Sequence, residues 1–312
     1  VKNVGLIIVD EEHDPSFKQS EGSFRYNARD SAITRGKLAS CPVVLGSATP
    51  SLETFYNSTQ IKKFTYLSLP KRSHTASKVD IEIININNIK PWEKKSPNIT
   101  NDLYKHLKQT IDSGEQAFIL YNRRGFSNYL QCNKCQQVLQ CPNCSVSLTY
   151  HQKAHIVSCH YCNLSQPFIE NCPRCSSLQV KGARTEEMGI LQLRGGGTEK
   201  AFDELKDLFP DVPMARFDKD TVKTESDYIE QLNAVREGKV KILVGTKMIA
   251  KGHDLPNVTL VGVIDSDVGL HLPDFRATER VYQLISQVSG RAGRGEKPGK
   301  VILQTREPFN HS

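Results

Sequence analysis

Eight of the nine cysteines in the 312-residue sequence stand in four pairs, each with the spacing C-x-x-C. Each pair can offer two thiolates to a tetrahedral ion, so four pairs can complete two closed structural zinc sites. A disulfide framework is the main alternative, but nothing in the sequence indicates an oxidising compartment. A redox-active dithiol is another use of C-x-x-C, although four consecutive pairs favour metal. The eight residues are Cys132, Cys135, Cys141, Cys144, Cys159, Cys162, Cys172 and Cys175.

An apolar run near the amino end of the sequence leads directly into four titratable residues. Residues 6–9 read LIIV and are followed by Asp10, Glu11, Glu12 and His13. An apolar strand that ends in Asp-Glu has the Walker B arrangement. In that arrangement the Asp lies beside a Mg²⁺–phosphate complex, and the next Glu polarises a water molecule for attack on the terminal phosphate. Acidic residues after a strand can also only begin a loop, so this motif alone leaves both interpretations open.

Small, hydroxyl-bearing and basic residues follow other apolar runs. Residues 46–50 read GSATP, a turn able to move against a neighbouring lobe, unless Ser47 or Thr49 only caps a helix. Residues 245–258 include Gly, Thr, Lys and Asp after an apolar run, and such loops contact a nucleic-acid backbone. Residues 287–294 read QVSGRAGR, whose two arginines can reach a phosphate as arginine fingers do, or form an ordinary basic loop.

The elements that must position these motifs are short apolar runs that alternate with amphipathic stretches. Because the apolar runs are β-branched and bounded by Gly, Asp or Pro, they indicate buried parallel strands. Strands that alternate with helices predict an α/β architecture with a largely parallel sheet. The expected strands are 5–10, 42–49, 117–122, 190–193, 241–246, 260–265 and 301–305, and the expected helices are 100–113, 199–209, 226–237 and 276–288.

Two stretches interrupt this alternation. Residues 71–100 are polar, basic and rich in Asn, which predicts a connector between domains. Residues 132–176 hold the cysteine pairs and little apolar content, so metal must replace a hydrophobic core there. The length predicts about two domains. The sequence also starts inside an apolar run, which we interpret as a sign of a fragment.

Charge and hydropathy narrow the class of protein. Lys and Arg outnumber Asp and Glu by 41 to 34, and the net charge of +7 favours anionic partners, although an ordinary soluble surface of modest net charge explains the total equally well. The surplus is local, because most of it falls in residues 60–100, as expected for a stretch that lies near phosphates. No apolar run reaches the ~18–20 residues of a membrane span, and no charged-then-apolar leader opens the sequence. We therefore expect neither membrane insertion nor secretion.

The motifs DEEH, GSATPS, GTKMIAKGHD and QVSGRAGR, in this order, resemble those of superfamily 2 nucleic-acid helicases. Residues 10–30, 122–126 and 250–280, together with the four cysteine pairs, are similar to the bacterial primosomal replication-restart helicases over essentially the whole sequence. This resemblance implies RecA-like helicase lobes with mostly parallel sheets and a small Cys-rich zinc-binding insertion. It also implies an ATP-dependent 3′→5′ DNA helicase that recognises stalled or recombined forks and initiates primosome assembly in the bacterial cytoplasm, associated with the nucleoid.

The resemblance also implies a division of the sequence. Residues 1–70 would form the carboxyl-terminal part of the first lobe, 71–100 the interlobe connector, 101–131 with 177–312 the second lobe, and 132–176 the insertion. In the insertion the cysteine pairs would be nested, with an outer zinc site of Cys132, Cys135, Cys172 and Cys175 and an inner zinc site of Cys141, Cys144, Cys159 and Cys162.

Functional residues are implied by motif match. Asp10 would hold the Mg²⁺ of ATP, Glu11 would orient the hydrolytic water, and His13 would couple this site to the second lobe. The residues that would reach the ATP phosphates from the opposite lobe are Gln287, Arg291 and Arg294. DNA binding or coupling would fall to Phe17, Lys18, Phe24, Arg25, Tyr26, Thr246 and Lys251, although the aromatic residues could instead pack on the lobe's own core. The implied partners are branched and single-stranded DNA, single-stranded DNA-binding protein and other primosome proteins, and no membrane.

One helicase motif does not occur in the 312 residues, namely the phosphate-binding loop G-x-x-x-x-G-K-[ST]. In the family this loop lies upstream of DEEH, so we expect it in a preceding part of the protein and expect the 312 residues alone not to hydrolyse ATP. A non-enzymatic zinc-ribbon protein that binds nucleic acid is the alternative function, and a thiol–disulfide oxidoreductase is a third.

Overall fold

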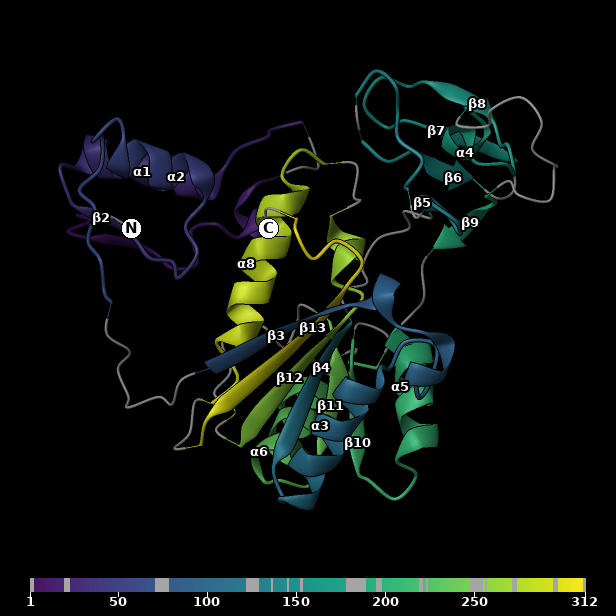
Figure 1. The fold of residues 1–312 in the computed structure, drawn as a ribbon. Coiled ribbons are helices and arrows are strands. Elements are labelled where there is room, and N and C mark those ends of the chain that lie inside the picture. The colour runs from purple at the N-terminus through teal and green to yellow at the C-terminus, as the bar shows by residue number, and fades with distance from the viewer. Residues whose placement is uncertain are drawn as a thin grey trace. The chain divides into compact units, whose positions relative to one another are not determined.

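The computed structural model divides the chain into two units, Val1–Arg72 and Ser73–Ser312, which are described one at a time (Figure 1). The structure describes residues 3–19, 23–70, 79–121, 129–135, 137–144, 146–151, 154–177, 189–194, 198–218, 221–222, 224–246, 255, 257–270, 274–293 and 297–310. Within these residues, none of the helices combines the length and the apolar character that crossing a membrane requires.

The first unit is built on two parallel strands, β1 (Ile7–Val9) and β2 (Val43–Leu45). The connection between them contains a short 3₁₀ helix, η1 (Pro15–Phe17), and helix α1 (Ala28–Ala39). Helix α1 packs closely on β2 at Gly36, where an added Cβ would lie 2.2 Å from Val43 Cγ2. The predicted strands are therefore present at both places, and their parallel pairing brings their carboxyl ends to the same edge.

Helix α2 (Leu52–Thr59) follows β2 in the same unit. Its N-cap is Ser51, whose hydroxyl accepts a hydrogen bond from the Thr54 N–H. The capping role considered for Ser47 or Thr49 therefore belongs to Ser51, because the chain runs on for two residues after Thr49 before the first helical turn. Ser47 and Thr49 are left to the loop between β2 and α2.

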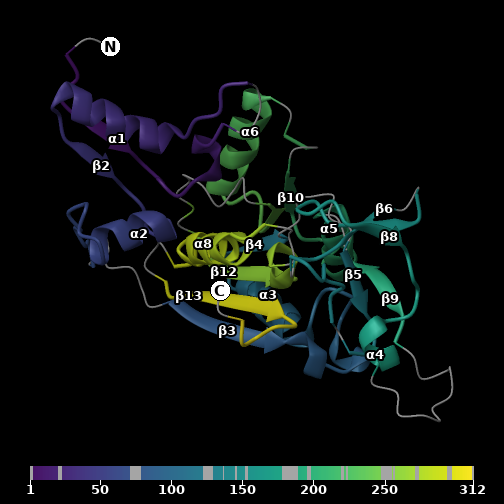
Figure 2. The same ribbon diagram turned by 90° about the horizontal axis from the view of Figure 1, so that it is seen from above.

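The second unit contains a six-stranded sheet in the order β10-β11-β4-β12-β13-β3 (Figure 1; seen from above in Figure 2), in which every neighbouring pair is parallel. The central strands β4 and β12 are buried along their whole length, as expected for strands covered by helices on both faces. The strands are β3 (Val79–Asn85), β4 (Gln116–Tyr121), β10 (Met214–Phe217), β11 (Ile242–Gly245), β12 (Val258–Ile264) and β13 (Gly299–Thr305).

Helices cover both faces of this sheet, so the core has two halves. Alternate residues of β4 divide between them: Phe118 and Leu120 pack with α6 and α8, whereas Ile119 packs with α3 and α5. The four helices match the four amphipathic stretches that the sequence predicts. They are α3 (Asn101–Asp112), α5 (Thr198–Leu208), α6 (Glu225–Arg236) and α8 (Ala277–Ser289). The described residues of this unit also form the 3₁₀ helices η2 (Ile86–Asn88), η3 (Pro91–Glu93) and η5 (Ser266–Gly269).

The cysteine-rich part of the second unit forms its own antiparallel sheet, in the order β8-β7-β6-β5-β9. A small cluster of apolar side chains lies beneath it, among them Leu130, Leu148, Val157 and Leu191, and four of the cysteines are buried in the same cluster. The elements are β5 (Tyr129–Cys132), β6 (Thr149–His151), β7 (Ile156–Ser158), β8 (Ser165–Pro167), α4 (Pro173–Ser177) and β9 (Leu191–Arg194).

Three segments differ from what the sequence predicts, and one of them is β10, where no strand is expected. The other two have distant partners. Residues 79–85, expected in the connector, form the edge strand β3, which pairs with β13 over seven residues. Residues 190–193, expected as a parallel strand, fall largely in β9, which pairs antiparallel with β5 of the cysteine-rich sheet. In both cases the partner strand lies more than 50 residues away in the sequence. The residues around each segment therefore carry no signal that shows which strand it pairs with.

Candidate functional site

The acidic motif and the GSATP turn meet at the carboxyl edge of the β1–β2 pair. Asp10 to His13 follow β1, and residues 46–50 follow β2. The two segments are joined through the backbone, because the Glu12 N–H donates to the Gly46 carbonyl at 3.1 Å and the Gly46 N–H donates to the Val9 carbonyl at 2.9 Å. The parallel topology therefore places both motifs at one site, where ligands commonly bind in α/β proteins.

Glu11 has an unusual backbone conformation at this edge. Its φ of 49° lies in the left-handed region, which non-glycine residues adopt at a cost of about 1–3 kcal/mol. The conformation is held by hydrogen bonds on both sides: the Glu11 N–H donates to Asp10 Oδ1 at 2.9 Å, and the Asp14 N–H donates to the Glu11 carbonyl at 2.8 Å. The Glu11 side chain is 42% exposed. A carboxylate presented in this way is accessible to a water molecule.

His13 connects the two segments through its side chain. The imidazole is almost fully buried, and its Nδ1 lies 2.7 Å from Ser47 Oγ and 3.5 Å from Glu11 Oε2. Ser47 Oγ also accepts a hydrogen bond from the Thr49 N–H at 3.0 Å. The ring therefore lies between the exposed carboxylate of one loop and the hydroxyl of the other, a position from which movement of either loop reaches the other.

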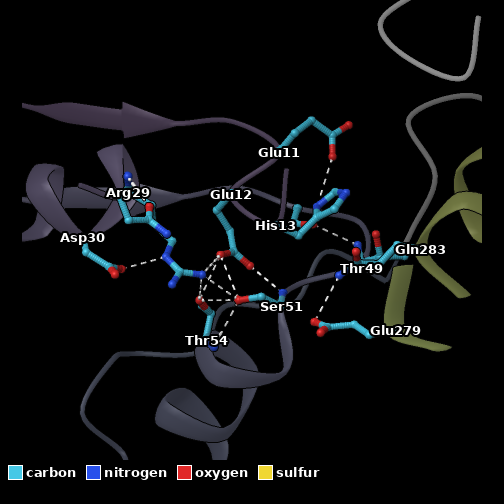
Figure 3. Close-up of polar contacts among 12 residues, drawn as sticks. Glu11, Glu12, His13, Arg29, Asp30, Thr49, Ser51, Thr54, Glu279 and Gln283 are labelled. Carbon is cyan, nitrogen blue, oxygen red and sulfur yellow. Dashed lines mark hydrogen bonds and ion pairs between the residues drawn. The ribbon is translucent and has the colours of Figure 1, made fainter. Parts of the chain in front are cut away.

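Glu12 has the most buried side chain of this motif, and the sequence analysis gave it no role. It is 2% exposed, and its carboxylate points toward Arg29, Ser51 and Thr54, whereas Glu11 points away from them (Figure 3). Its partners lie 17 to 42 residues further along the chain. No pattern around DEEH indicates them, so only the three-dimensional structure reveals this network.

The aromatic residues of the loop between β1 and α1 are largely exposed. Phe24 is 79% exposed, and its ring centroid lies 6.0 Å from that of Tyr26, which is also exposed. Lys18 and Arg25 are exposed beside them, whereas Phe17 is half-buried. A bridge between Lys18 and Asn27 closes the loop at its base. The alternative interpretation required Phe24 and Tyr26 to pack on the core of their unit. Both side chains are exposed instead.

Of the candidate residues that the structure describes in the second unit, two are buried and one is half-buried. Arg291 is 6% exposed and lies near Tyr228, whose pKa is raised by burial while the Arg291 charge opposes that rise. Thr246 is 2% exposed and follows β11, and its hydroxyl has no hydrogen-bond partner among the described residues. Gln287 is half-buried on α8. Lys251 and Arg294 lie outside the described residues.

The eight paired cysteines form two groups of four. One group is Cys132, Cys135, Cys172 and Cys175, the other is Cys141, Cys144, Cys159 and Cys162, and within each group all four sulfurs lie within 4.8 Å of one another. The sulfur–sulfur distances of 3.6 and 3.7 Å match the ~3.8 Å edge of a tetrahedron whose metal–sulfur bonds are about 2.3 Å. None of the cysteines forms a disulfide. Both groups could therefore hold zinc.

One thiol in each group is predisposed to ionise. The backbone N–H of Cys162 is the main cause that lowers the pKa of Cys159 to about 7. Burial raises the pKa of Cys132, but the N–H groups of Cys135 and Lys134, each 3.4 Å from its sulfur, outweigh burial and bring that pKa to about 7. In the same groups burial and the neighbouring thiols raise the pKa of Cys135 and of Cys144 to about 12, so ionisation of all four ligands of a group requires a bound cation.

Gly189 completes the first of these groups and was not expected from the sequence. An added Cβ at this position would lie 2.3 Å from Cys132 Sγ and 3.0 Å from Cys175 Sγ. The Gly189 carbonyl also accepts a hydrogen bond from the Cys172 N–H at 2.8 Å. The backbone therefore passes against the sulfurs at a distance that only glycine allows.

We expect Gly189→Ala to lower the zinc content of the purified protein from two ions per chain to about one, because the methyl group displaces the sulfurs of Cys132 and Cys175. Metal analysis by mass spectrometry measures the change. Ser165→Ala, at an exposed position of β8 in the same sheet, is the matched control and should retain two ions. If Gly189→Ala still bound two ions per chain, the backbone at residue 189 would not lie as close to the sulfurs as the structure indicates.

Comparisons with known proteins identify both the cysteine-rich region and the surrounding parallel-sheet region of the second unit. Residues 141–167 match the model of the PriA DNA helicase Cys-rich region (CRR) domain, and residues 196–296 match that of the helicase conserved C-terminal domain. The chain is 43%, 42% and 40% identical to the replication restart proteins PriA of Chlamydia trachomatis, Bacillus subtilis and Haemophilus influenzae, over 99%, 100% and 98% of its length. It spans only 40%, 37% and 40% of those relatives.

Solved structures show a weaker similarity. RecG bound to a three-way DNA junction superposes on 96% of the chain and 26% of its own, with 15% identity and a TM-score of 0.44. Dbp5 of S. cerevisiae bound to RNA and ADP BeF3 superposes on 96% of the chain and 53% of its own, with 12% identity and a TM-score of 0.42.

Proposed function

The chain belongs to the family of PriA replication restart proteins, and we propose that the whole protein is an ATP-dependent DNA helicase. One observation supports the proposal most strongly. Asp10, Glu11 and His13 lie at the same edge of a parallel strand pair as Ser47, which His13 contacts. This is the arrangement that a Walker B strand requires, since the strand end fixes the carboxylates and the neighbouring loop senses them.

The residues at this edge fit ATP with Mg²⁺. Mg²⁺ prefers one or two carboxylates and retains several waters, and Asp10 offers one exposed carboxylate at the end of β1. Glu11 orients the attacking water, because its carboxylate is exposed and its backbone is fixed. His13 passes the state of this site to the loop that carries Ser47. By motif match, contact with the ATP phosphates is also assigned to Gln287, Arg291 and Arg294.

DNA contacts are assigned to two regions. Phe24 and Tyr26 present exposed rings beside Arg25, and such rings stack on unpaired bases without sequence preference. Phe17 and Lys18 lie at the base of the same loop. Through them, the binding of DNA to the loop affects Glu11. In the second unit, Lys251 is assigned to the DNA backbone, and Thr246, which is 2% exposed, is assigned to coupling.

The cysteine groups bind two Zn²⁺ ions, whose role is structural. The apolar cluster beneath the antiparallel sheet is small and shares its interior with cysteines, so metal bonds supply the stability that burial alone does not. The resulting rigid surface is suited to contacts with other primosome proteins.

The finer features of the proposal follow the family. The whole protein moves 3′→5′, recognises stalled or recombined forks, initiates primosome assembly and works with single-stranded DNA-binding protein in the bacterial cytoplasm, at the nucleoid. The test uses partial duplexes with a single-stranded 3′ or 5′ tail. We expect ATP-dependent strand separation with the 3′ tail and little with the 5′ tail, and the opposite preference would overturn the assigned direction.

We expect the 312 residues alone to hydrolyse no ATP, with or without DNA, because the sequence holds no phosphate-binding loop. Release of phosphate from purified protein, in the presence of single-stranded DNA, measures this. The Glu11→Gln variant, purified in the same way, shows how much phosphate a contaminating ATPase releases. DNA-stimulated hydrolysis that depends on Glu11 would contradict the expectation.

A further inference from the structure

The side chain of Glu12 is a buried anion held by several donors. Its Oε1 accepts the Ser51 N–H at 2.6 Å. Its Oε2 accepts the Ser51 hydroxyl at 3.1 Å, the Thr54 hydroxyl at 2.9 Å and Nη1 of Arg29 at 3.0 Å. These four hydrogen bonds satisfy both oxygens of the buried carboxylate.

Arg29 is the cation of this network and binds a second carboxylate at its other side. Its Nε donates to Asp30 Oδ1 at 2.9 Å, but the Asp30 side chain is 60% exposed whereas that of Glu12 is 1% exposed. Burial lowers the pKa of Arg29, yet the hydrogen bonds of Asp30 and Glu12 outweigh burial and raise it. The network therefore joins one buried ion pair to one exposed ion pair that share the same guanidinium.

The network connects two helices, α1 and α2, to the loop that carries the acidic motif. Arg29 lies in the first turn of α1, while Ser51 caps α2 and Thr54 lies in its first turn. The backbone of Glu12 is tied to the loop after β2 through the Gly46 carbonyl. Residue 12 is thus fixed both by its side chain and by its N–H, and its two neighbours in the sequence are Glu11 and His13.

We propose that Glu12 is a positioning residue: its buried carboxylate anchors the loop after β1 to α1 and α2 and thereby holds Glu11 in the left-handed conformation that presents its carboxylate to water. The strain at Glu11 persists only if the surrounding structure fixes it, and the four hydrogen bonds of Glu12 supply that constraint. The proposal rests on the proposed role of Glu11 in ATP hydrolysis. It assigns Glu12 no contact with nucleotide.

The first arm of the test measures ATP hydrolysis by the whole protein. Glu12→Gln keeps the size of the side chain but places an amide against Arg29, and we expect kcat to fall about tenfold or more while KM for ATP changes less than about threefold. Glu12→Gln combined with Arg29→Gln forms a neutral pair and should recover part of kcat. Asp30→Asn, which removes only the exposed partner of Arg29, is the matched control and should change kcat less than about twofold.

The second arm measures hydrogen exchange in the 312-residue chain and does not depend on ATP. The Asp14 N–H, which donates to the Glu11 carbonyl, reports the turn at Glu11, and the Cys41 N–H, which donates to the Gly36 carbonyl, reports the distant end of α1. In Glu12→Gln we expect exchange at Asp14 to accelerate about tenfold and exchange at Cys41 to change little. In Asp30→Asn both should remain as in the wild type.

The outcomes separate this proposal from the proposed function. A whole protein without ATPase activity overturns the proposed function, while the exchange arm still decides whether Glu12 positions the turn. Unchanged kcat together with unchanged exchange at Asp14 overturns the positioning role. Equal acceleration at Asp14 and Cys41, without recovery in the double variant, also overturns it, because Glu12 would then only stabilise the unit as a whole.

Discussion

Replacement of Glu11 by Gln is expected to lower kcat for DNA-stimulated ATP hydrolysis by the whole protein about 10²–10⁴-fold, the usual contribution of a residue that handles a proton. The amide retains the size of the side chain but cannot accept a proton from water. Because the Glu11 side chain is 42% exposed and lies 3.5 Å from His13 Nδ1, we expect the substitution to leave folding nearly unchanged. We therefore expect the unfolding free energy to change by less than about 0.5 kcal/mol.

Steady-state kinetics over a range of ATP concentrations measures this effect, and thermal unfolding of the same samples verifies folding. Asp14→Asn is the matched control, since Asn can still accept the hydrogen bond from the Ser16 N–H that caps η1. Its kcat should remain within about twofold of the wild type. A Glu11→Gln protein that retains most of the wild-type kcat would remove Glu11 from the mechanism.

Loss of one cysteine ligand is expected to have the largest effect on stability. Cys159→Ser should lower the zinc content from two ions per chain to one and unfold strands β6 to β8 around the second cysteine group. A serine hydroxyl is a poor substitute for a thiolate, and a structural zinc ion contributes about 10–16 kcal/mol to the folding of small metal-bound domains. The apolar cluster under the sheet is too small to replace such a contribution.

Metal analysis and limited proteolysis measure this second effect. Cys41→Ser, which changes the cysteine outside both groups, is the control and should keep two ions and an intact cysteine-rich sheet. The same measurement on the wild type tests the redox alternative. A chain that contains no metal and has a titratable dithiol would contradict the structural zinc sites.

Much of the fold could be predicted from local patterns. The four helices of the second unit follow amphipathic stretches, and the buried strands β4, β11, β12 and β13 follow apolar runs, because burial on both faces of a parallel sheet requires continuous apolar sequence. The edge strand β3 was not predicted. It reads VDIEIIN, and charged residues on a strand at the edge of a sheet resemble those of a connector.

The candidate site was predictable only where its chemistry lies in neighbouring residues. The motif DEEH and the C-x-x-C pairs are recognisable from their residue types and spacing alone, so both were visible in the sequence. Glu12 and Gly189 were not, because their roles depend on residues brought together by the fold: Arg29 and Ser51 for Glu12, and the sulfurs of Cys132 and Cys175 for Gly189. A contact between residues that are far apart in the sequence produces no periodic pattern in either local segment, so it cannot be predicted from such a pattern.

Unwinding of a forked DNA duplex by the whole protein tests the central claim most directly. Strand separation is followed by fluorescence with ATP, with a non-hydrolysable ATP analogue and without nucleotide. The account predicts separation only with hydrolysable ATP and none in the Glu11→Gln protein. A whole protein that binds the fork but neither hydrolyses ATP nor separates its strands would contradict the account and would identify a zinc-ribbon protein that binds nucleic acid without catalysis.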